Sequence, residues 1–198
     1  MSFINHQAKR IHCKIVYYGP SLGGKTTNMQ WVYNEVAGGG KNKDDMFSLP
    51  TDVERTLFFD FLPLNVGDIR GFETRFHVYT VPGQVVYDSL RRPLIRGLDG
   101  VIFVADSQAE RMEENLQALD NLEKNLEMQG YNLSELPLVL QYNKRDLPSA
   151  LPVTDLRTAL NRFNAPDFEA MANQGKGVLE SFKTVSRAII TVLKGGEL

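Results

Sequence analysis

The sequence predicts one domain over residues 1–198 with a three-layer α/β/α fold. The central layer is a mostly parallel, six-stranded sheet with one antiparallel edge strand. Two observations lead to this fold class. Short apolar segments rich in β-branched residues alternate with segments whose apolar residues recur at helical spacing, as in parallel sheets crossed by helices. One pair of strand-like segments is instead joined by a short turn sequence, which adds an antiparallel strand. A chain of 198 residues is long enough for one domain with a sizeable core.

The first strand, helix and loop follow in order from the N-terminus. Residues 11–18, IHCKIVYY, are β-branched and aromatic and stop at Gly19, which predicts a strand. From Lys25 to Val36 the apolar residues fall at i, i+3, i+4 and i+7, which predicts a helix with a face of Met29, Val32, Tyr33 and Val36. Residues 37–54 are glycine-rich and lack periodicity, which predicts a long loop of the kind that is often functional.

The middle of the chain contains three predicted strands. Residues 56–64 and 72–81 are predicted to form a hairpin, with Gly67 in the connecting turn. Residues 101–106, VIFVAD, are apolar up to the last position, which is typical of a strand buried on both faces of a sheet.

The second half continues the alternation. Ser107 followed by Glu110 matches a capping box, which predicts the start of a helix. Residues 136–143 and 167–172 are predicted as strands, and 154–163 as a short helix. Ligands of such sheets bind at the carboxyl ends of the strands, so the site is expected there. The last helix is predicted to have an apolar face of Val178, Phe182, Val185, Ile189, Val192 and Leu193.

Composition and charge exclude several classes of function. The net charge is −2 and the basic residues are scattered, so binding to nucleic acid is not expected. The single cysteine, Cys13, lies in an apolar run and cannot form an internal disulfide, which fits a buried thiol in a reducing compartment. No apolar segment approaches the roughly 18 residues of a membrane span, and the sequence lacks a signal peptide, an N-terminal glycine for myristoylation and a C-terminal cysteine for prenylation. We therefore expect a cytoplasmic protein without direct membrane insertion.

Residues 19–26, GPSLGGKT, fit the phosphate-binding pattern G-x-x-x-x-G-K-[ST] between a predicted strand and a predicted helix. Glycines let backbone N–H groups turn toward phosphate oxygens, and the start of the helix adds a partial positive charge. Lys25 would reach the β- and γ-phosphates, and the Thr26 hydroxyl would bind Mg²⁺. This context predicts a nucleotide-binding protein. The predicted phosphate-binding residues in this segment are Gly19, Ser21, Leu22, Gly23, Gly24, Lys25, Thr26 and Thr27.

Residues 143–146, NKRD, follow the predicted strand LPLVLQY. The Asp146 carboxylate can accept hydrogen bonds from guanine N1–H and the 2-amino group, a pair of donors that adenine lacks. Asn143 would brace the loop or contact guanine N7, and the Lys144 stem would cover the base plane. Together with the phosphate loop, the motif favours GTP and GDP as the bound nucleotides.

The two motifs together resemble those of the Ras-like branch of the P-loop GTPases. In that family the third strand ends in Asp-x-x-Gly-Gln, which here corresponds to Thr80, Gly83 and Gln84. The resemblance implies that Gly83 places its N–H on the γ-phosphate and that Gln84 orients the attacking water. Thr80 would support Mg²⁺ through a water molecule with less charge than the usual aspartate, and Asp60 is either a compensating carboxylate or an ordinary edge-strand residue. The family also implies that the backbone N–H of Ala172 contacts guanine O6.

A second resemblance is carried by six longer stretches, which are CKIVYYGP, GKTTN, RTLFFDFLPL, TRFHVYTVPGQ, VIFVADSQ and QYNKRDLP. Together they resemble the MglA family, the bacterial Ras-like GTPases of gliding and type IV pilus motility that mark a cell pole. The resemblance implies that Thr56, or alternatively Thr51, contacts Mg²⁺ and the γ-phosphate, and that Arg55 is an arginine finger supplied in cis. It implies a GTP-hydrolysing switch that is monomeric on its own and reaches the pole through partners. The implied partners are an MglB-like homodimer of the roadblock fold, which stimulates hydrolysis, and effectors of polarity and motility.

Two departures from the family pattern leave alternatives open. Ser21 stands where glycine is usual, near the expected γ-phosphate, and the loop before Arg55 is longer than expected. A GTP-binding module with little or no hydrolysis is therefore the second hypothesis. A kinase built on the same loop is the third, although the sequence has no arginine-rich lid and the NKRD motif favours guanine.

Overall fold

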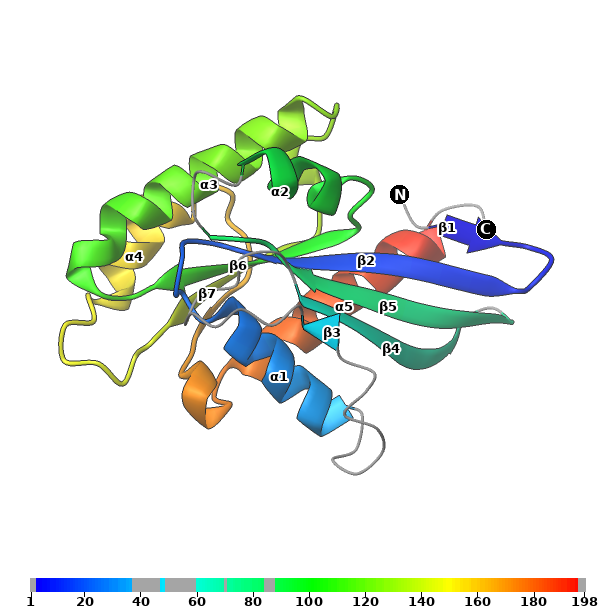
Figure 1. The fold of residues 1–198 in the computed structure, drawn as a ribbon, viewed down its shortest axis with the longest axis horizontal. Coiled ribbons are helices and arrows are strands. Elements are labelled where there is room, and N and C mark those ends of the chain that lie inside the picture. The colour runs from blue at the N-terminus through cyan, green and yellow to red at the C-terminus, as the bar shows by residue number, and fades with distance from the viewer. Residues whose placement is uncertain (1–2, 37–46, 49–59, 70, 84–87, 196–198) are drawn as a thin grey trace.

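The computed structural model describes residues 3–36, 47–48, 60–69, 71–83 and 88–195. Within these ranges the strands form a single sheet in the order β3-β4-β5-β2-β6-β7-β8, with β1 paired to β2 (Figure 1). Strands β5, β2, β6, β7 and β8 are parallel, and β1, β3 and β4 pair antiparallel with their neighbours. The bounds are β1 Phe3–Asn5, β2 Arg10–Tyr18, β3 Phe47–Ser48, β4 Asp60–Ile69, β5 Phe72–Thr80, β6 Gly100–Asp106, β7 Leu138–Asn143 and β8 Asp167–Glu169.

The predicted mostly parallel sheet is confirmed, but the strand count is larger than six. The additional strands, β1 and β3, are two or three residues long and antiparallel. Strand β6 pairs with β2 only at residues 15–18. The edge of β2 at residues 10–12 is therefore open, and β1 pairs with it there.

Helices cover both faces of the sheet. In Figure 1, α1 and α5 lie on one side of the sheet, and α2, α3 and α4 lie on the other. Two buried clusters correspond to these two layers, and fully buried Cys13 belongs to the cluster under α1 and α5. Gly100 of β6 lies so close under α5 that a Cβ there would be 2.8 Å from the side chains of Val185 and Ile189. The helices are α1 Lys25–Val36, α2 Asp88–Ile95, α3 Met112–Glu127, α4 Val153–Leu160 and α5 Val178–Gly195.

The hairpin turn lies at a different glycine from the predicted one. Gly67 is inside β4, where the register shifts between residues 65 and 67, and it pairs with Thr74 of β5. Pairing continues as far as Ile69 and Phe72, and the turn uses Gly71, whose φ of +82° suits a left-handed position. A glycine in a strand interior often marks such a bulge, and the sequence alone did not distinguish this role from a turn.

The capping box predicted at Ser107 is wrong. The backbone N–H of Ser107 donates to the carbonyl of Asn143 at 3.0 Å, and the Ser107 carbonyl accepts from the N–H of Leu151 at 2.8 Å. These bonds hold Ser107 as an extension of β6, and the buried Ser107 hydroxyl has no hydrogen-bond partner among the residues that the structure describes. A short 3₁₀ turn, η3 (Ala109–Arg111), follows, and α3 begins only at Met112.

The C-terminal elements match the prediction with three differences, one of which is that α4 ends at Leu160 and not at residue 163. Strand β8 ends at Glu169, so residues 170–172 leave the sheet and lead into a 3₁₀ turn, η5 (Ala172–Gln174). Four of the predicted core residues of α5 are buried and Leu193 is partly buried against the same cluster, whereas Val192 is 62% exposed. Among the described residues, no helix combines the length and hydropathy needed to cross a membrane.

Candidate nucleotide-binding site

The phosphate-binding sequence forms a tight loop between β2 and α1. Gly19 has a φ of +137°, and a Cβ at this position would lie 2.2 Å from the carbonyl oxygen of Val104 in β6. Leu22 adopts a φ of +59° and leaves its side chain 47% exposed. The strand–loop–helix context predicted for GPSLGGKT is therefore present.

Lys25, the first residue of α1, places its ammonium group on this loop. The side chain is only 6% exposed, and Nζ donates to the carbonyl oxygens of Gly19 at 3.1 Å and Pro20 at 2.6 Å. A buried ammonium group is costly unless it is well hydrogen-bonded. The loop therefore holds a cation beside the N-terminus of a helix of 12 residues, and both features attract phosphate. Half-buried Thr26 follows directly, and Thr27 lines the neighbouring cavity.

A cavity of about 220 Å³ lies between the phosphate loop and the NKRD motif. It is lined by residues from three segments that are far apart in the sequence. This grouping contains the guanine-binding residues that the sequence predicts. The lining residues are Leu22, Gly24, Thr27, Asn143, Lys144, Asp146, Leu147, Ala172 and Asn173. The Asp146 carboxylate accepts a hydrogen bond from Asn173 Nδ2 at 3.0 Å, which fixes one of its two oxygens.

Asn143 joins the phosphate loop to the base cavity. Its Nδ2 donates to the carbonyl oxygen of Gly23 at 2.8 Å, and its Oδ1 accepts from the backbone N–H of Ala172 at 2.9 Å. Any Cβ on Gly24 would lie 2.2 Å from the same Nδ2. Of the two roles predicted for Asn143, this geometry is that of the brace. Asn143 also accepts from the Ala172 N–H, the group that the family resemblance assigned to guanine O6.

Asp106 at the end of β6 is a functional candidate that the sequence analysis missed. Its side chain is completely buried and accepts a hydrogen bond of 2.5 Å from Lys144 Nζ, while Gln108 donates to it from its backbone and its side chain. Arg111 lies 3.8 Å from the same carboxylate and donates to the carbonyl oxygen of Ser21 at 2.7 Å. Asp106 therefore anchors two cations, one on the base cavity and one on the phosphate loop.

The segment TVPG reaches the phosphate loop from the end of β5. Thr80 is fully buried and lies beside Tyr17 in the parallel register of β5 and β2. Gly83 approaches the loop so closely that a Cβ would lie 2.4 Å from both the backbone nitrogen and Cα of Ser21. The structure thus brings Gly83 against Ser21, and only a glycine fits at position 83.

Several predicted residues lie outside the described part of the chain. These are Arg55, Thr56, its alternative Thr51, and Gln84. Asp60 is described only through its backbone, which begins β4 and pairs with Ser48 of β3. Within the described ranges, no three His, Cys, Asp or Glu side chains form a cluster that could hold a metal ion.

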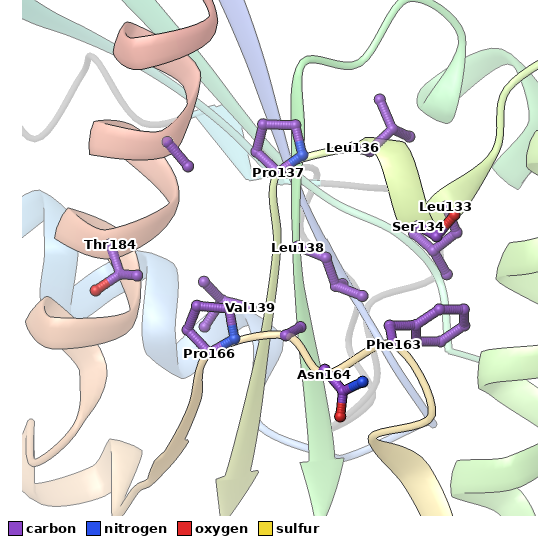
Figure 2. A pocket seen from close by; sticks show the side chains of 12 residues that line it. Leu133, Ser134, Leu136, Pro137, Leu138, Val139, Phe163, Asn164, Pro166 and Thr184 are labelled. Carbon is purple, nitrogen blue, oxygen red and sulfur yellow. The ribbon is translucent and has the colours of Figure 1, made fainter.

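A second cavity, of about 260 Å³, lies at the opposite end of β7 (Figure 2). It is bounded by the start of β7, the segment before β8 and one side of α5. None of the described residues that line it carries a formal charge. Its lining is thus unsuited to phosphate, in contrast to the cavity beside Lys25. Representative lining residues are Leu136, Pro137, Leu138, Phe163, Pro166 and Thr184.

A glycine-rich phosphate loop coupled to a cavity that contains the NKRD aspartate is the arrangement of guanine-nucleotide-binding Ras-like domains. The family model of the ADP-ribosylation factor family matches residues 55–189, so the chain belongs to this family of small GTPases. The family implies guanine nucleotide binding and a nucleotide-dependent switch.

The relatives give a more particular result. The chain is 57% identical over 196 residues to the mutual gliding-motility protein MglA of Myxococcus xanthus (strain DK1622), covering 99% of this chain and 100% of that protein. The resemblance to the MglA family predicted from the sequence is therefore confirmed. The chain is also 34% identical over 148 residues to human ADP-ribosylation factor-like protein 4C, covering 74% of this chain and 67% of that protein. The mouse ADP-ribosylation factor-like protein 4D is 30% identical over 160 residues, which cover 80% and 69% of the two chains.

Proposed function

We propose that the chain is a GTP-hydrolysing switch of cell polarity and motility. The observation that carries this proposal is the side chain of Asn143, which connects the phosphate loop to the cavity that contains Asp146. An anion-binding loop and a guanine-selective carboxylate joined in this way fit GTP and GDP better than any other nucleotide. The 57% sequence identity to an MglA protein over 99% of the chain supports the assignment to motility.

In the proposed reaction, four residues of the chain act on the phosphate groups of GTP. Gly83 donates its N–H to a γ-phosphate oxygen, and Gln84 orients the attacking water. Arg55, acting in cis, neutralises the negative charge that grows on the phosphate oxygens in the transition state. The Lys25 ammonium group now donates to two carbonyl oxygens of the phosphate loop, and it would donate to phosphate oxygens instead when a nucleotide binds.

Mg²⁺, when bound, adds positive charge beside the β- and γ-phosphates. The hydroxyl of Thr26 fits this ion because Thr26 follows Lys25 in the first turn of α1. Thr56 is the proposed second ligand, and Thr80 would hydrogen-bond a water on the metal. With Thr26 and Thr56 both bound to Mg²⁺, the loop of residues 37–54 would become ordered only when the γ-phosphate is present.

The proposed regulator is a roadblock-fold homodimer similar to MglB, which would accelerate hydrolysis by holding residues 38–56 and 82–97 in position. Polarity and motility proteins would bind the GTP form.

We propose that the chain is monomeric, acts in the cytoplasm and is recruited to a cell pole through these partners. Vesicle sedimentation tests this, since the proposal requires that the chain alone does not bind anionic vesicles in either nucleotide state.

One observation favours a second candidate function, a GTP-binding module with little hydrolysis. Gly83 packs directly against Ser21, so a serine side chain at the phosphate loop could crowd the space needed by Gln84 and the water. The two candidates predict different single-turnover results. A switch hydrolyses bound GTP slowly alone and much faster with the roadblock partner, whereas a module keeps GTP intact in both conditions.

The decisive experiment combines two measurements on the purified full chain. Nucleotide extraction followed by chromatography should release GDP or GTP and no adenine nucleotide. Single-turnover hydrolysis is then measured with and without the roadblock homodimer, using Ser21→Gly as a comparison. Absence of guanine nucleotide binding would refute the proposal, and hydrolysis restored only by Ser21→Gly would establish the second candidate.

A further inference from the structure

Helix α2 carries a buried cation that the proposed reaction does not use. Arg91 is 2% exposed and is among the largest fully buried side chains of the described residues. Its neighbour Arg92 is exposed and donates to Asn125 of α3 at 3.1 Å. A guanidinium group stays charged at all physiological pH values, so its burial needs compensating contacts.

The contacts of Arg91 come from three different elements. Its Nε donates to the carbonyl oxygen of Pro82 at 2.8 Å, and its Nη1 donates to Asn121 Oδ1 at 2.7 Å in α3. Its guanidinium carbon lies 5.6 Å from the ring centre of Tyr18, whose hydroxyl donates to the same Asn121 oxygen at 2.5 Å. Among the described residues, the groups in contact with Arg91 are thus neutral, and the bond to Pro82 is charge-assisted.

The bond to Pro82 fixes the direction of the next peptide N–H. Every described peptide bond is trans, and in a trans peptide the C=O and the following N–H point in opposite directions. Because the Pro82 carbonyl points to Arg91, the N–H of Gly83 points away from it. Gly83 itself packs against Ser21 of the phosphate loop. The N–H side of the Pro82–Gly83 peptide therefore faces the phosphate-binding side of the molecule.

We infer that Arg91 is a positioning residue for recognition of the terminal phosphate of GTP. Its guanidinium group holds the Pro82–Gly83 peptide in the orientation in which Gly83 N–H can donate to a γ-phosphate oxygen. Asn121 and Tyr18 hold the guanidinium group in turn. GDP has no γ-phosphate, so this arrangement favours GTP over GDP without touching either nucleotide. The inference rests on the proposed function, because it assigns the Gly83 N–H to the γ-phosphate.

The test compares affinities for GTPγS and GDP by competition with a fluorescent guanine nucleotide, using the full chain in the presence of Mg²⁺. Arg91→Met removes the hydrogen bond to Pro82 but keeps an unbranched apolar side chain. We expect GDP affinity to change by less than about twofold and GTPγS affinity to fall by about tenfold, as for one lost hydrogen bond of ordinary strength. Arg92→Met, which removes the adjacent link between α2 and α3, is the matched control and should change neither affinity.

Arg91→Lys provides the conservative comparison, since one ammonium group can still donate to the Pro82 carbonyl. It should recover part of the lost preference for GTPγS, and it serves as the test variant if Arg91→Met does not fold by circular dichroism. Equal losses of GDP and GTPγS affinity, or a preference unchanged from wild type, would overturn the inference. A wild-type chain that binds no guanine nucleotide would instead refute the proposed function, so the two failures are distinct.

Discussion

Asn143 donates a hydrogen bond to the carbonyl oxygen of Gly23, 2.8 Å away and 120 residues earlier in the chain. The same side chain accepts from the N–H of Ala172, so one amide connects all three segments around the base cavity. Both partners are buried or nearly so, and Asn143 itself is 2% exposed. The integrity of the phosphate loop and that of the base cavity therefore depend on one residue.

Asn143→Ala should lower both stability and nucleotide affinity. The substitution leaves a carbonyl and an N–H without partners, which costs about 2 to 4 kcal/mol for the two groups together. Urea unfolding of the nucleotide-free chain measures the stability, and fluorescent GDP titration measures the affinity. Asn34→Ala, on the exposed side of α1, is the control and should stay within about 0.5 kcal/mol of wild type.

Asp146→Asn should change the preferred base. Its carboxylate would accept from guanine N1–H and the 2-amino group, and the amide would instead suit xanthine, whose edge offers a carbonyl. Charge-assisted hydrogen bonds of this type contribute about 1.5 to 3 kcal/mol each, so GTP affinity should fall at least about tenfold while xanthosine triphosphate affinity rises. Competition titrations with both nucleotides measure the exchange. Unchanged GTP binding would contradict the assignment of the cavity. The control is Asp155→Asn, at an exposed position of α4.

Asp106→Asn should destabilise the chain and weaken guanine binding. The carboxylate is fully buried, whereas Lys144 and Arg111 are 26% and 23% exposed and can regain contact with water. We therefore expect a loss of about 2 kcal/mol, below the value for breaking a fully buried ion pair. Chemical denaturation with and without GDP separates the two effects. Asp120→Asn, which removes an exposed partner of Arg162, should have little effect.

Asp167 gives a pH-dependent contribution to stability. Hydrogen bonds from Arg157 to both carboxylate oxygens, at 2.6 and 2.7 Å, lower the pKa of Asp167, and Asn161 and Tyr142 add to this effect. Because the folded pKa is lowered, the stabilisation is present above the ordinary pKa near 4 and is lost as pH falls through the lowered value.

Arg157→Met should therefore raise the pKa of Asp167 and lower the stability at pH 7 by no more than a solvent-exposed ion pair contributes, since Arg157 is about half exposed. The difference between wild type and variant should shrink steadily below about pH 4. Carboxyl NMR titration measures the pKa, and urea unfolding across this range measures the stability. A difference that is the same at pH 2 and pH 7 would contradict the assigned cause.

The proposed catalytic residues give the largest expected effect on rate. Arg55→Ala and Gln84→Leu should each remove hydrolysis stimulated by the roadblock homodimer while GTP affinity stays nearly unchanged. An arginine finger contributes about 10³ to 10⁵ in rate, so the loss is large enough to separate from any folding defect. Single-turnover assays measure this loss of rate. The control is Arg10→Ala, at the first residue of β2, which is the end away from the phosphate loop. A full response of Arg55→Ala to the partner would require the arginine to come from elsewhere.

The sequence predicted the parts of the fold and site that local patterns encode. The strands that end at Tyr18, Asp106 and Asn143 are apolar runs stopped by a glycine or a polar residue, and each ends within a residue of its predicted boundary. The phosphate loop was equally predictable, because its glycines and lysine are adjacent in the chain. Gly67 was misassigned because a bulge and a turn favour the same residue type.

The unpredicted parts depend on contacts between distant residues. Asp106 and Lys144 are 38 residues apart, and no spacing rule links an aspartate at one strand end to a lysine after the next strand. Arg91 carries no motif, and its burial follows from the positions of Tyr18 and Asn121 on other elements. Helix α2 also escaped prediction, since its Pro93 interrupts the usual helical signal within only eight residues.

The fully buried Cys13 has a practical consequence for spectroscopy. It is the one cysteine in the 198 residues, and a thiol with no surface exposure reacts slowly with maleimide reagents. A cysteine introduced at an exposed position such as Met128, which is 57% exposed, would then take up a dye selectively without removal of the native thiol. A single substitution therefore allows labelling at one chosen point, and nucleotide exchange and partner binding can be followed by fluorescence on otherwise unaltered protein.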